Sequence, residues 1–239
     1  MRTALVTGAT GGLGEHIVRF LDSKGVRTVV HCHENEEAAR RLRHELKGVA
    51  AIVRGDISDY HTVLSMSEEV IQKVGSVDII INNASITIDK LLVRYTEDEW
   101  DRVINTNLKG AFNVIKSFVP QMIEHGGGHI INISSYSGIR GSEGQAAYSA
   151  SKAGLIGLTL SLSKELSVYN IKINALIPGY LPLGMGLKAA EAMKRAADVS
   201  ALGGLSSPDD VVELICFILK SGSITGQVFT CESRVGFNY

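Results

Sequence analysis

Residues 3–14 read TALVTGATGGLG, a short apolar run that ends in a cluster of glycines. A helical pattern follows at once, because Ile17, Val18 and Leu21 recur at the spacing of one helix face. Glycines between a strand and a helix allow a tight turn and leave free N–H groups at the helix start. The stretch therefore predicts a first strand and a first helix of an α/β fold, joined by a turn that a phosphate group can approach closely.

The same alternation of apolar runs and helical patterns continues along the chain. Strands are expected at residues 4–6, 27–30, 49–53, 77–81, 129–133, 171–177 and 227–231. Helices are expected at residues 15–23, 35–47, 60–74, 97–124 (in two stretches), 148–168 and 208–219. Strands that alternate with helices predict an α/β fold, a Rossmann-type doubly wound parallel sheet of seven strands. We expect residues 1–239 to form a single domain, with residues 180–205 as a flap over its site.

The composition argues against several classes of protein. Among 239 residues, 24 Lys and Arg stand against 25 Asp and Glu, which does not suit a general nucleic-acid binder. No apolar run approaches the roughly 18 residues that span a bilayer, so no membrane partner is expected. Cys32, Cys216 and Cys231 are too few for a disulfide framework or a zinc cluster, and no metal is expected. The start of the chain shows no targeting segment, which predicts a cytoplasmic protein.

The glycine-rich turn predicts a dinucleotide site. Gly8, Gly12 and Gly14 have the spacing G-x-x-x-G-x-G, which differs from the G-x-G-x-x-G of the common fingerprint. At the first strand-to-helix junction of a parallel sheet, such glycines bring a pyrophosphate onto the helix N-terminus. A flexible surface turn is the alternative interpretation of the same glycines.

The end of the second strand bears on the choice of dinucleotide. Residues 30–33 read VHCH and include no acid that could bind ribose hydroxyls, which favours NADP. NAD stays an alternative, because this segment has no arginine and Glu34 follows it directly. His33 is a candidate contact for the 2′-phosphate, with a solvated loop histidine as the alternative. Asp56, after the third strand, is placed either to meet the adenine or to form a turn.

Four polar residues form a candidate catalytic set. Tyr148 and Lys152 lie four positions apart at the start of a predicted helix, so they share one face. A neighbouring ammonium lowers the pKa of a phenol, which lets a tyrosine exchange a proton with an alcohol or ketone near neutral pH. Ser135 follows the strand at 129–133, and Asn107 divides two helical stretches. Taken alone, a tyrosine and a lysine at this spacing are more typical of a helix surface.

Together these motifs resemble the classical short-chain dehydrogenase/reductase family. The resemblance covers essentially the whole chain. It rests on Thr7-Gly8-x-x-x-Gly12-x-Gly14, Asn82-Asn83-Ala84, Asn107, Ser135, Tyr148-x-x-x-Lys152 and Pro178-Gly179. Within the family, residues 89–92 (DKLL) and 98–100 (DEW) resemble the 3-oxoacyl-acyl-carrier-protein reductases of fatty acid synthesis.

The resemblance implies transfer of a hydride between a nicotinamide and a carbonyl carbon. Tyr148 would be the general acid in reduction, and Lys152 would lower its pKa and bind the nicotinamide ribose. Ser135 would orient the carbonyl, and Asn107 would hold a proton-relay water. The residues expected to bind the cofactor are Gly8, Thr10, Gly11, Gly12, Leu13, Gly14, His33, Asp56, Ile57, Asn83, Ala84, Ser85, Tyr148, Lys152, Pro178, Gly179 and Leu181.

The sequence also departs from the family pattern. Ser85 stands where a glycine usually follows Asn-Asn-Ala, and Leu183 stands where a threonine often bonds the nicotinamide carboxamide. Residues 124–128 and 168–170 lack the arginines that carrier-protein reductases often present, so we expect weak docking of an acidic carrier protein. Residues 231–234 replace the usual Gly-Gly ending. These changes affect cofactor and partner recognition and spare the residues of the proton chemistry.

Three functions follow, in order of preference. The first is an NADP(H)-dependent oxidoreductase that reduces a ketone, foremost a 3-oxoacyl thioester. The second is the same chemistry on a small ketone, sugar or cyclic alcohol. The third is a nucleotide-binding protein without catalysis, which only Ser85 and Leu183 favour. An excess of apolar residues at 107–119 and in the helix from Ala153 suggests a buried partner face, and the resemblance implies a homotetramer.

Overall fold

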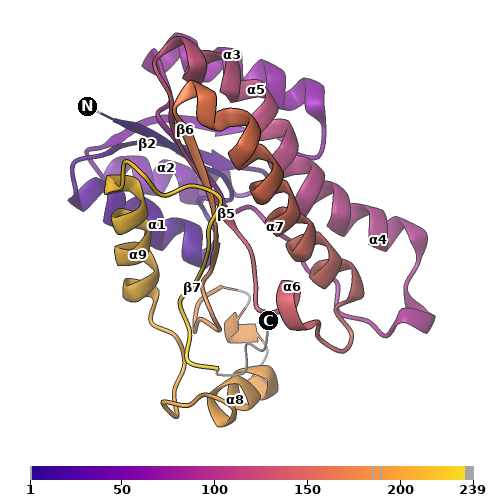
Figure 1. The fold of residues 1–239 in the computed structure, drawn as a ribbon. Coiled ribbons are helices and arrows are strands. Elements are labelled where there is room, and N and C mark those ends of the chain that lie inside the picture. The colour runs from indigo at the N-terminus through magenta and orange to yellow at the C-terminus, as the bar shows by residue number, and fades with distance from the viewer. Residues whose placement is uncertain (1, 185, 189, 235–239) are drawn as a thin grey trace.

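The computed structural model describes residues 2–184, 186–188 and 190–234. Seven strands form one parallel sheet in the order β3-β2-β1-β4-β5-β6-β7. They are β1 (Thr3–Val6), β2 (Arg27–Cys32), β3 (Val49–Arg54), β4 (Ile79–Asn82), β5 (Gly128–Ile133), β6 (Ile171–Ile177) and β7 (Val228–Thr230). The predicted doubly wound sheet is confirmed (Figure 1). Its strand order reverses between β1 and β4, where sheets of this kind bind ligands.

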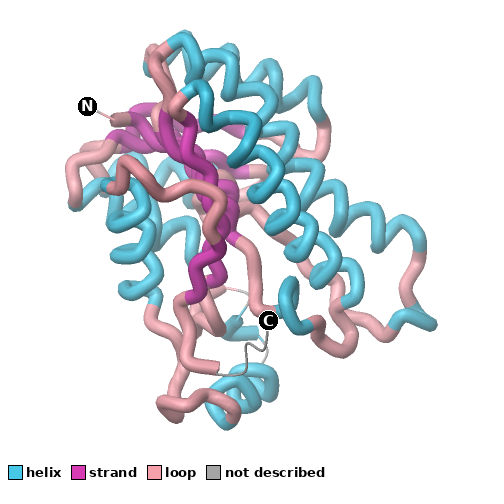
Figure 2. Tube along the Cα trace, viewed as in Figure 1, coloured by secondary structure: helices cyan, strands magenta, loops and turns pink. Residues whose placement is uncertain are grey.

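Helices cover both faces of the sheet (Figures 1 and 2). One face carries α1 (Gly12–Ser23), α2 (Glu36–Glu45) and α9 (Pro208–Lys220). The other carries α3 (Tyr60–Val74), α5 (Gly110–Glu124) and α7 (Ala146–Leu166). Further segments are α4 (Glu97–Ile104), α6 (Ser137–Arg140), α8 (Ala190–Asp198), η1 (Leu92–Arg94), η2 (Asn105–Lys109), η3 (Ser167–Tyr169) and η4 (Gly186–Lys188). Within the described ranges, none of the helices has the length and apolar character needed to cross a membrane.

The alternation of side chains along each strand builds two apolar layers. In β1, Ala4 and Val6 belong to the layer with α1, α2 and α9, whereas Leu5 belongs to the layer with α3 and α5. Residues 79–81 of β4 are fully buried, as expected for a central strand covered on both faces. Each such side chain contributes roughly 1.5–3 kcal/mol on burial, so the centre of the sheet is the rigid base of the site.

The fourth strand begins at Ile79 rather than at the predicted residue 77. The amide of Gln121, on α5, takes up both backbone groups of Val77. Gln121 Oε1 accepts the Val77 N–H (3.2 Å), and Gln121 Nε2 donates to the Val77 carbonyl (3.0 Å). Val77 is 1% exposed, so the apolar pattern predicted its burial correctly. The pattern could not show that a helix side chain, instead of a neighbouring strand, satisfies its backbone.

The two helical stretches predicted at residues 97–124 are α4 and α5, joined by the wide π turn η2. A capping box starts α4, because the Thr96 hydroxyl accepts the Glu99 N–H and the Glu99 carboxylate accepts the Thr96 N–H (3.2 Å each). Asn107 lies in the π turn and is 1% exposed. Single π turns inside helices are frequent at functional sites, because they redirect a side chain.

The segment predicted as a flap, residues 180–205, contains the helix α8 and lies at the carboxyl edge of the sheet (Figure 1). Positions 185 and 189 of this segment, and residues 1 and 235–239 of the predicted domain, lie outside the described residues. Gly184 packs on the glycine-rich turn, since a Cβ on Gly12 would come within 2.6 Å of Gly184 N. The segment therefore covers part of the turn.

Candidate active site

The glycine-rich turn joins β1 to α1 at the carboxyl edge of the sheet. Gly8 has a φ of +60°, and a Cβ there would lie 2.7 Å from Ala84 Cα. A Cβ on Gly14 would lie 2.2 Å from the Gly8 carbonyl oxygen, so neither position has room for a side chain. Gly11 is the N-cap of α1 and gives its first-turn N–H groups no capping side chain. This cradle of backbone N–H groups fits the pyrophosphate of a dinucleotide.

Thr7 fixes the glycine-rich turn against the loop after β4. Its Oγ1 accepts the N–H groups of Asn83 and Ala84 (3.0 Å each). The Asn83 amide in turn donates to the carbonyls of Thr7 (2.9 Å) and Gly8 (3.1 Å). Sequence reasoning did not assign Thr7 to the site, although a hydroxyl residue directly after a buried strand was a usable signal. The result is that Asn83 and Ala84 lie against the turn, as a shared binding surface requires.

The adenosine side of the predicted site lies at the ends of β2 and β3. His33 is exposed, and its carbonyl accepts a hydrogen bond from Arg54 Nε (3.0 Å). Cys32 pairs with Arg54 in the sheet, which brings this guanidinium beside the end of β2. Arg54 Nη1 also lies 3.7 Å from Glu36 Oε2. Sequence reasoning missed Arg54, because strand register and not local pattern places its charge next to residues 30–33.

Asp56 shapes the loop after β3. Its Oδ1 accepts the Ser58 N–H (2.9 Å), which is the turn-forming role weighed from the sequence. Ile57 is 4% exposed, and its carbonyl accepts a hydrogen bond from Asn113 Nδ2 on α5 (2.8 Å). A Cβ on Gly110 would lie 2.7 Å from the Ile57 side chain. The loop is thus held firmly, and an adenine contact by Asp56 and Ile57 stays a prediction.

Lys152 is enclosed at the centre of the site. The residue is 2% exposed, and its Nζ donates to the Ile133 carbonyl at the end of β5 (2.8 Å). Burial lowers the pKa of Lys152 to about 7. Ser134 Oγ donates to the Lys152 carbonyl (2.8 Å), so the end of β5 also fixes the second turn of α7.

Tyr148 lies one turn before Lys152 on α7, with its ring centroid 5.6 Å from Lys152 Nζ. Burial is the largest influence on the Tyr148 phenol and raises its pKa. The nearby hydroxyls of Ser135 and Ser85 lower this pKa, and the charge of Asp89 raises it. The sequence predicted a lowered pKa, whereas burial raises it in this structure. The prediction counted the lysine charge but not the burial that disfavours both charged forms.

Asn107 connects the loop after β4 with α7. Its Oδ1 accepts the Ile86 N–H (2.8 Å), and its Nδ2 donates to the Ile86 carbonyl (2.9 Å) and to Ser151 Oγ (3.0 Å). Ser151 Oγ then donates to the Tyr148 carbonyl (2.7 Å). The side chain of Asn107 therefore fixes Ser85, the neighbour of Ile86, relative to the Tyr148 helix.

The ends of β5 and β6 supply the other predicted residues. Ser135 Oγ accepts the Ser137 N–H (3.2 Å) at the start of the loop after β5. Gly179, which follows Pro178, has a φ of +74°, and a Cβ there would lie 2.0 Å from Ser206 Oγ. Leu181 is 9% exposed and belongs to the apolar layer of α1, so its backbone, not its side chain, is left to meet a ligand.

Most of the predicted site residues therefore gather along one edge of the sheet. Thr10 and Leu13 belong to the same turn as the glycines, and Asn83–Ser85 follow β4 directly. Ser135 and residues 178–181 follow β5 and β6, and the Ser135 hydroxyl lies beside Tyr148 on α7. His33, Asp56 and Ile57 lie apart from this group, at the outer strands β2 and β3.

The fold and the site define a dinucleotide-binding oxidoreductase of the Rossmann type. The chain belongs to the short chain dehydrogenase family, whose profile matches residues 2–194. Members of this family bind a nicotinamide dinucleotide, NAD or NADP. The family predicted from the motifs is thereby confirmed.

Individual relatives match over nearly the full length of the chain. It is 40% identical over 233 residues to the 3-oxoacyl-[acyl-carrier-protein] reductase FabG of Thermotoga maritima, which covers 95% of this chain and 94% of that protein. The reductase of the same name from Staphylococcus aureus is 39% identical over 232 residues, with 95% and 94% covered. Nodulation protein G of Azospirillum brasilense is 36% identical over 244 residues, with 100% and 98% covered. The resemblance to 3-oxoacyl-acyl-carrier-protein reductases is also confirmed.

Proposed function

We propose that the protein is an NADP(H)-dependent reductase that converts the ketone of a 3-oxoacyl thioester to an alcohol. The observation that carries the proposal is the pair of half-buried Tyr148 and fully buried Lys152, fixed beside Ser135 and tied through Ser151 to Asn107. The substrate class is supported by the names of the relatives from Thermotoga maritima and Staphylococcus aureus.

The cofactor has a complete set of candidate contacts. The turn from Gly8 to Gly14 would hold the pyrophosphate on the N-terminus of α1, as its crowded glycine positions and uncapped N–H groups indicate. Asn83 and Ala84 would line the adenosine side of the dinucleotide, and residues 178–181 would line its nicotinamide end. When bound, the reduced nicotinamide supplies the hydride for the carbonyl carbon.

The proton chemistry belongs to this chain. The raised pKa of Tyr148 keeps its phenol protonated at neutral pH, which suits the donor of a proton to the substrate oxygen during reduction. The Ser135 hydroxyl would donate a hydrogen bond to the same oxygen and orient it. The pKa of Lys152, about 7, lets its amine exchange a proton with solvent or with Tyr148 near neutral pH.

Preference for NADP over NAD is supported by charge at the ends of β2 and β3. The Arg54 guanidinium lies beside His33, where a 2′-phosphate would extend from the adenosine ribose. Residues 30–33 offer no carboxylate to repel that phosphate. Glu36, 3.7 Å from Arg54, offsets part of this positive charge, so NAD is retained as the second candidate cofactor.

A second function, reduction of a small ketone, sugar or cyclic alcohol, is supported by the surface at the amino edge of the sheet. Residues 124–128 and 168–170 are Glu-His-Gly-Gly-Gly and Val-Tyr-Asn, without a lysine or arginine. The two segments bond each other, since Asn170 Nδ2 donates to the Gly126 carbonyl (2.8 Å). This surface would attract an acidic carrier protein only weakly, whereas a small substrate does not need a charged docking surface.

The test follows the loss of NADPH or NADH absorbance with a short 3-oxoacyl thioester and, in parallel, with small ketones. We expect turnover of the thioester that favours NADPH and falls at least about 100-fold in Tyr148→Phe. Tyr169→Phe is the matched control, because Tyr169 is 47% exposed and lies at the opposite edge of the sheet.

Three other results of this assay would point to different conclusions. Full turnover by Tyr148→Phe would overturn the assigned proton donor. Turnover of small ketones without thioesters would favour the second function. Binding of NADPH without turnover of any carbonyl compound would favour the nucleotide-binding protein.

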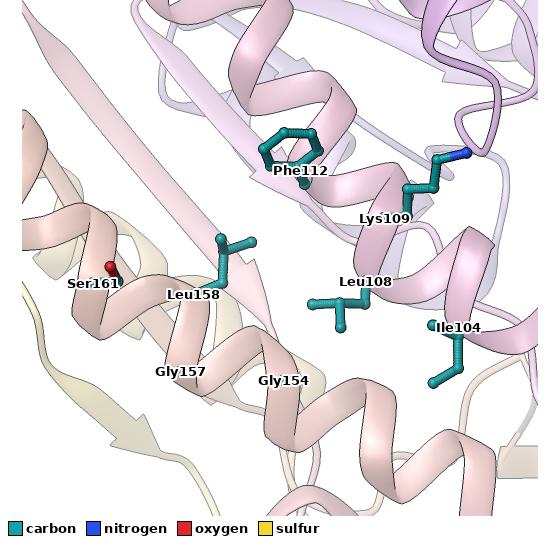
Figure 3. A pocket seen from close by; sticks show the side chains of 8 residues that line it. All are labelled: Ile104, Leu108, Lys109, Phe112, Gly154, Gly157, Leu158 and Ser161. Atoms are coloured by element: carbon teal, nitrogen blue, oxygen red, sulfur yellow. The ribbon is translucent and has the colours of Figure 1, made fainter.

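The proposal includes a homotetramer. A groove of about 520 Å³ runs between α7 and the α4–η2–α5 segment. It is lined by Ile104, Leu108, Lys109, Phe112, Gly154, Gly157, Leu158 and Ser161. Figure 3 shows Leu158 and Leu108 pointing into the groove from its two sides, while the Lys109 amine points away from it. Phe112 is 43% exposed, so a partner subunit would bury apolar surface here.

We also propose that the protein works in the cytoplasm. Its cysteines Cys32, Cys216 and Cys231 are all free thiols. Free thiols are typical of the reducing interior of a cell, where glutathione and thioredoxin keep cysteines reduced.

A further inference from the structure

One buried histidine has no part in the proposed proton chemistry. His31 lies on β2, only two positions before His33, and is 1% exposed. Its Nδ1 accepts the Gly8 N–H (3.2 Å), and its Nε2 donates to the Gly55 carbonyl (3.1 Å). Its own carbonyl accepts the Ala9 N–H (2.9 Å). A buried side chain with both ring nitrogens bonded to backbone is an ordered bridge between two segments.

The two bridged segments lie on opposite sides of β2. The strand order β3-β2-β1 puts the turn after β1 on one side and the loop after β3 on the other. The first segment holds Gly8, whose carbonyl accepts the Gly11 N–H (3.1 Å) and lies against Gly14. The second begins at Gly55 and continues into Asp56 and Ile57. One imidazole thus connects the proposed pyrophosphate cradle with the proposed adenine side.

The bridge requires one protonation state of the ring. An acceptor role for Nδ1 and a donor role for Nε2 define the neutral imidazole with its hydrogen on Nε2. A second proton, on Nδ1, would face the Gly8 N–H donor. Burial lowers the pKa of His31 to about 4, which preserves the neutral form. Two charged groups act on the ring. The charge of His33, two positions further along the chain, lowers the pKa of His31, and the charge of Asp56, after β3, raises it.

We propose that His31 is a positioning residue, which holds the glycine-rich turn and the loop after β3 in the spacing that a dinucleotide requires. The inference rests on the proposed cofactor site, but not on the identity of the ketone. Its effect is expected on cofactor affinity and not on the proton-transfer step, because His31 touches neither Tyr148 nor Lys152 in its described hydrogen bonds.

Two substitutions separate hydrogen bonding from packing. His31→Asn keeps an acceptor near the place of Nδ1, so it can still accept the Gly8 N–H. His31→Leu fills a similar space but leaves the Gly8 N–H and the Gly55 carbonyl without this partner. His129→Leu is the matched control. His129 is also buried on a strand with a pKa of about 4, but it begins β5 at the far edge and its Nδ1 has no partner among the described residues.

The experiment titrates the folded wild type and the three variants with NADPH, by calorimetry, and then measures kcat and KM for NADPH. His31→Leu is expected to raise the Kd and KM for NADPH about tenfold while kcat stays within about twofold. His31→Asn and His129→Leu are expected to stay within about threefold of the wild-type Kd. Circular dichroism and a cooperative melt establish folding for each variant.

Three outcomes would overturn the inference. They are a wild-type Kd in folded His31→Leu, an equal loss in His31→Asn, and an equal loss in His129→Leu. If His31→Leu does not fold, amide hydrogen exchange of Gly8 in wild type decides the question. Slow exchange supports the bridge, and exchange at the open-chain rate overturns it. A wild type that binds neither NADPH nor NADH would instead refute the proposed function, before any variant is compared.

Discussion

At the scale of single residues, burial governs the titrating groups of the site more than charge does. It lowers the pKa of Lys152 to about 7 and raises that of Tyr148, although the two side chains share a helix face. Near neutral pH the tyrosine therefore keeps its proton, while the lysine is charged in only part of the molecules. This state is prepared for proton donation to a ketone, the direction of reduction.

The charge of Arg54 leads to a prediction about cofactor choice. Arg54→Gln is expected to raise KM for NADPH about tenfold and to change KM for NADH little, because only NADPH carries the 2′-phosphate. Arg43→Gln, on the exposed side of α2, is the control and should change neither value. Steady-state kinetics with both cofactors measures the ratio. Equal changes for NADPH and NADH would contradict the assignment.

At the scale of elements, the sequence predicted each strand and the main helices, because apolar periodicity reports burial directly. It also placed the glycine-rich turn and Tyr148 at the correct edge. It missed the roles of Thr7, Arg54 and Gln121, since each depends on a partner from a distant segment. His31 and His33 show the same limit, because the sequence does not reveal that His31 is buried within β2 while His33 lies exposed past its end.

The groove between α7 and the α4–η2–α5 segment leads to a prediction about assembly. Wild type is expected to sediment as a tetramer, and Phe112→Lys as a smaller species, because the charge would be buried in an apolar interface. Leu64→Lys, at a side chain on α3 that is 37% exposed, should leave the mass unchanged. Analytical ultracentrifugation distinguishes these results. A monomeric wild type would rule out this interface.

At the scale of the whole molecule, two buried histidines connect stability with pH. His31 and His129 have their pKa lowered to about 4 by burial, from 6.5 in the unfolded chain. Between pH 4 and pH 6.5 the unfolded state therefore binds more protons than the folded state. The stability that the two neutral histidines provide is complete above about pH 6.5 and is lost as the pH falls toward 4. Carboxylates with lowered pKa values, such as Glu45 and Glu99, lose theirs only in more acid solution.

The lowered pKa of His31 predicts a measurable loss of stability in mild acid. Between pH 7.5 and pH 5, the free energy of unfolding should fall by about 2 kcal/mol through His31 alone. Urea unfolding at both pH values measures the change. In His31→Asn, which has no titrating side chain at this position, the free energy of unfolding should fall by about 2 kcal/mol less than in wild type. A wild type equally stable at both pH values would show that the histidine shift is absent.

The position of β1 has a consequence for how the chain folds during synthesis. The first strand made becomes an interior strand next to the centre of the sheet, and its Thr3 N–H donates to the Asp78 carboxylate, 75 positions later. Arg2 reaches further, because its guanidinium donates to the Leu219 carbonyl at the end of α9, 217 positions away. Contacts so distant in sequence close slowly, and in a nascent chain the layer that α1 and α2 form on one face of the sheet stays incomplete until α9 has left the ribosome. A chain truncated before α9 would therefore expose the apolar surface that α9 covers in this layer and depend on chaperones to stay unaggregated.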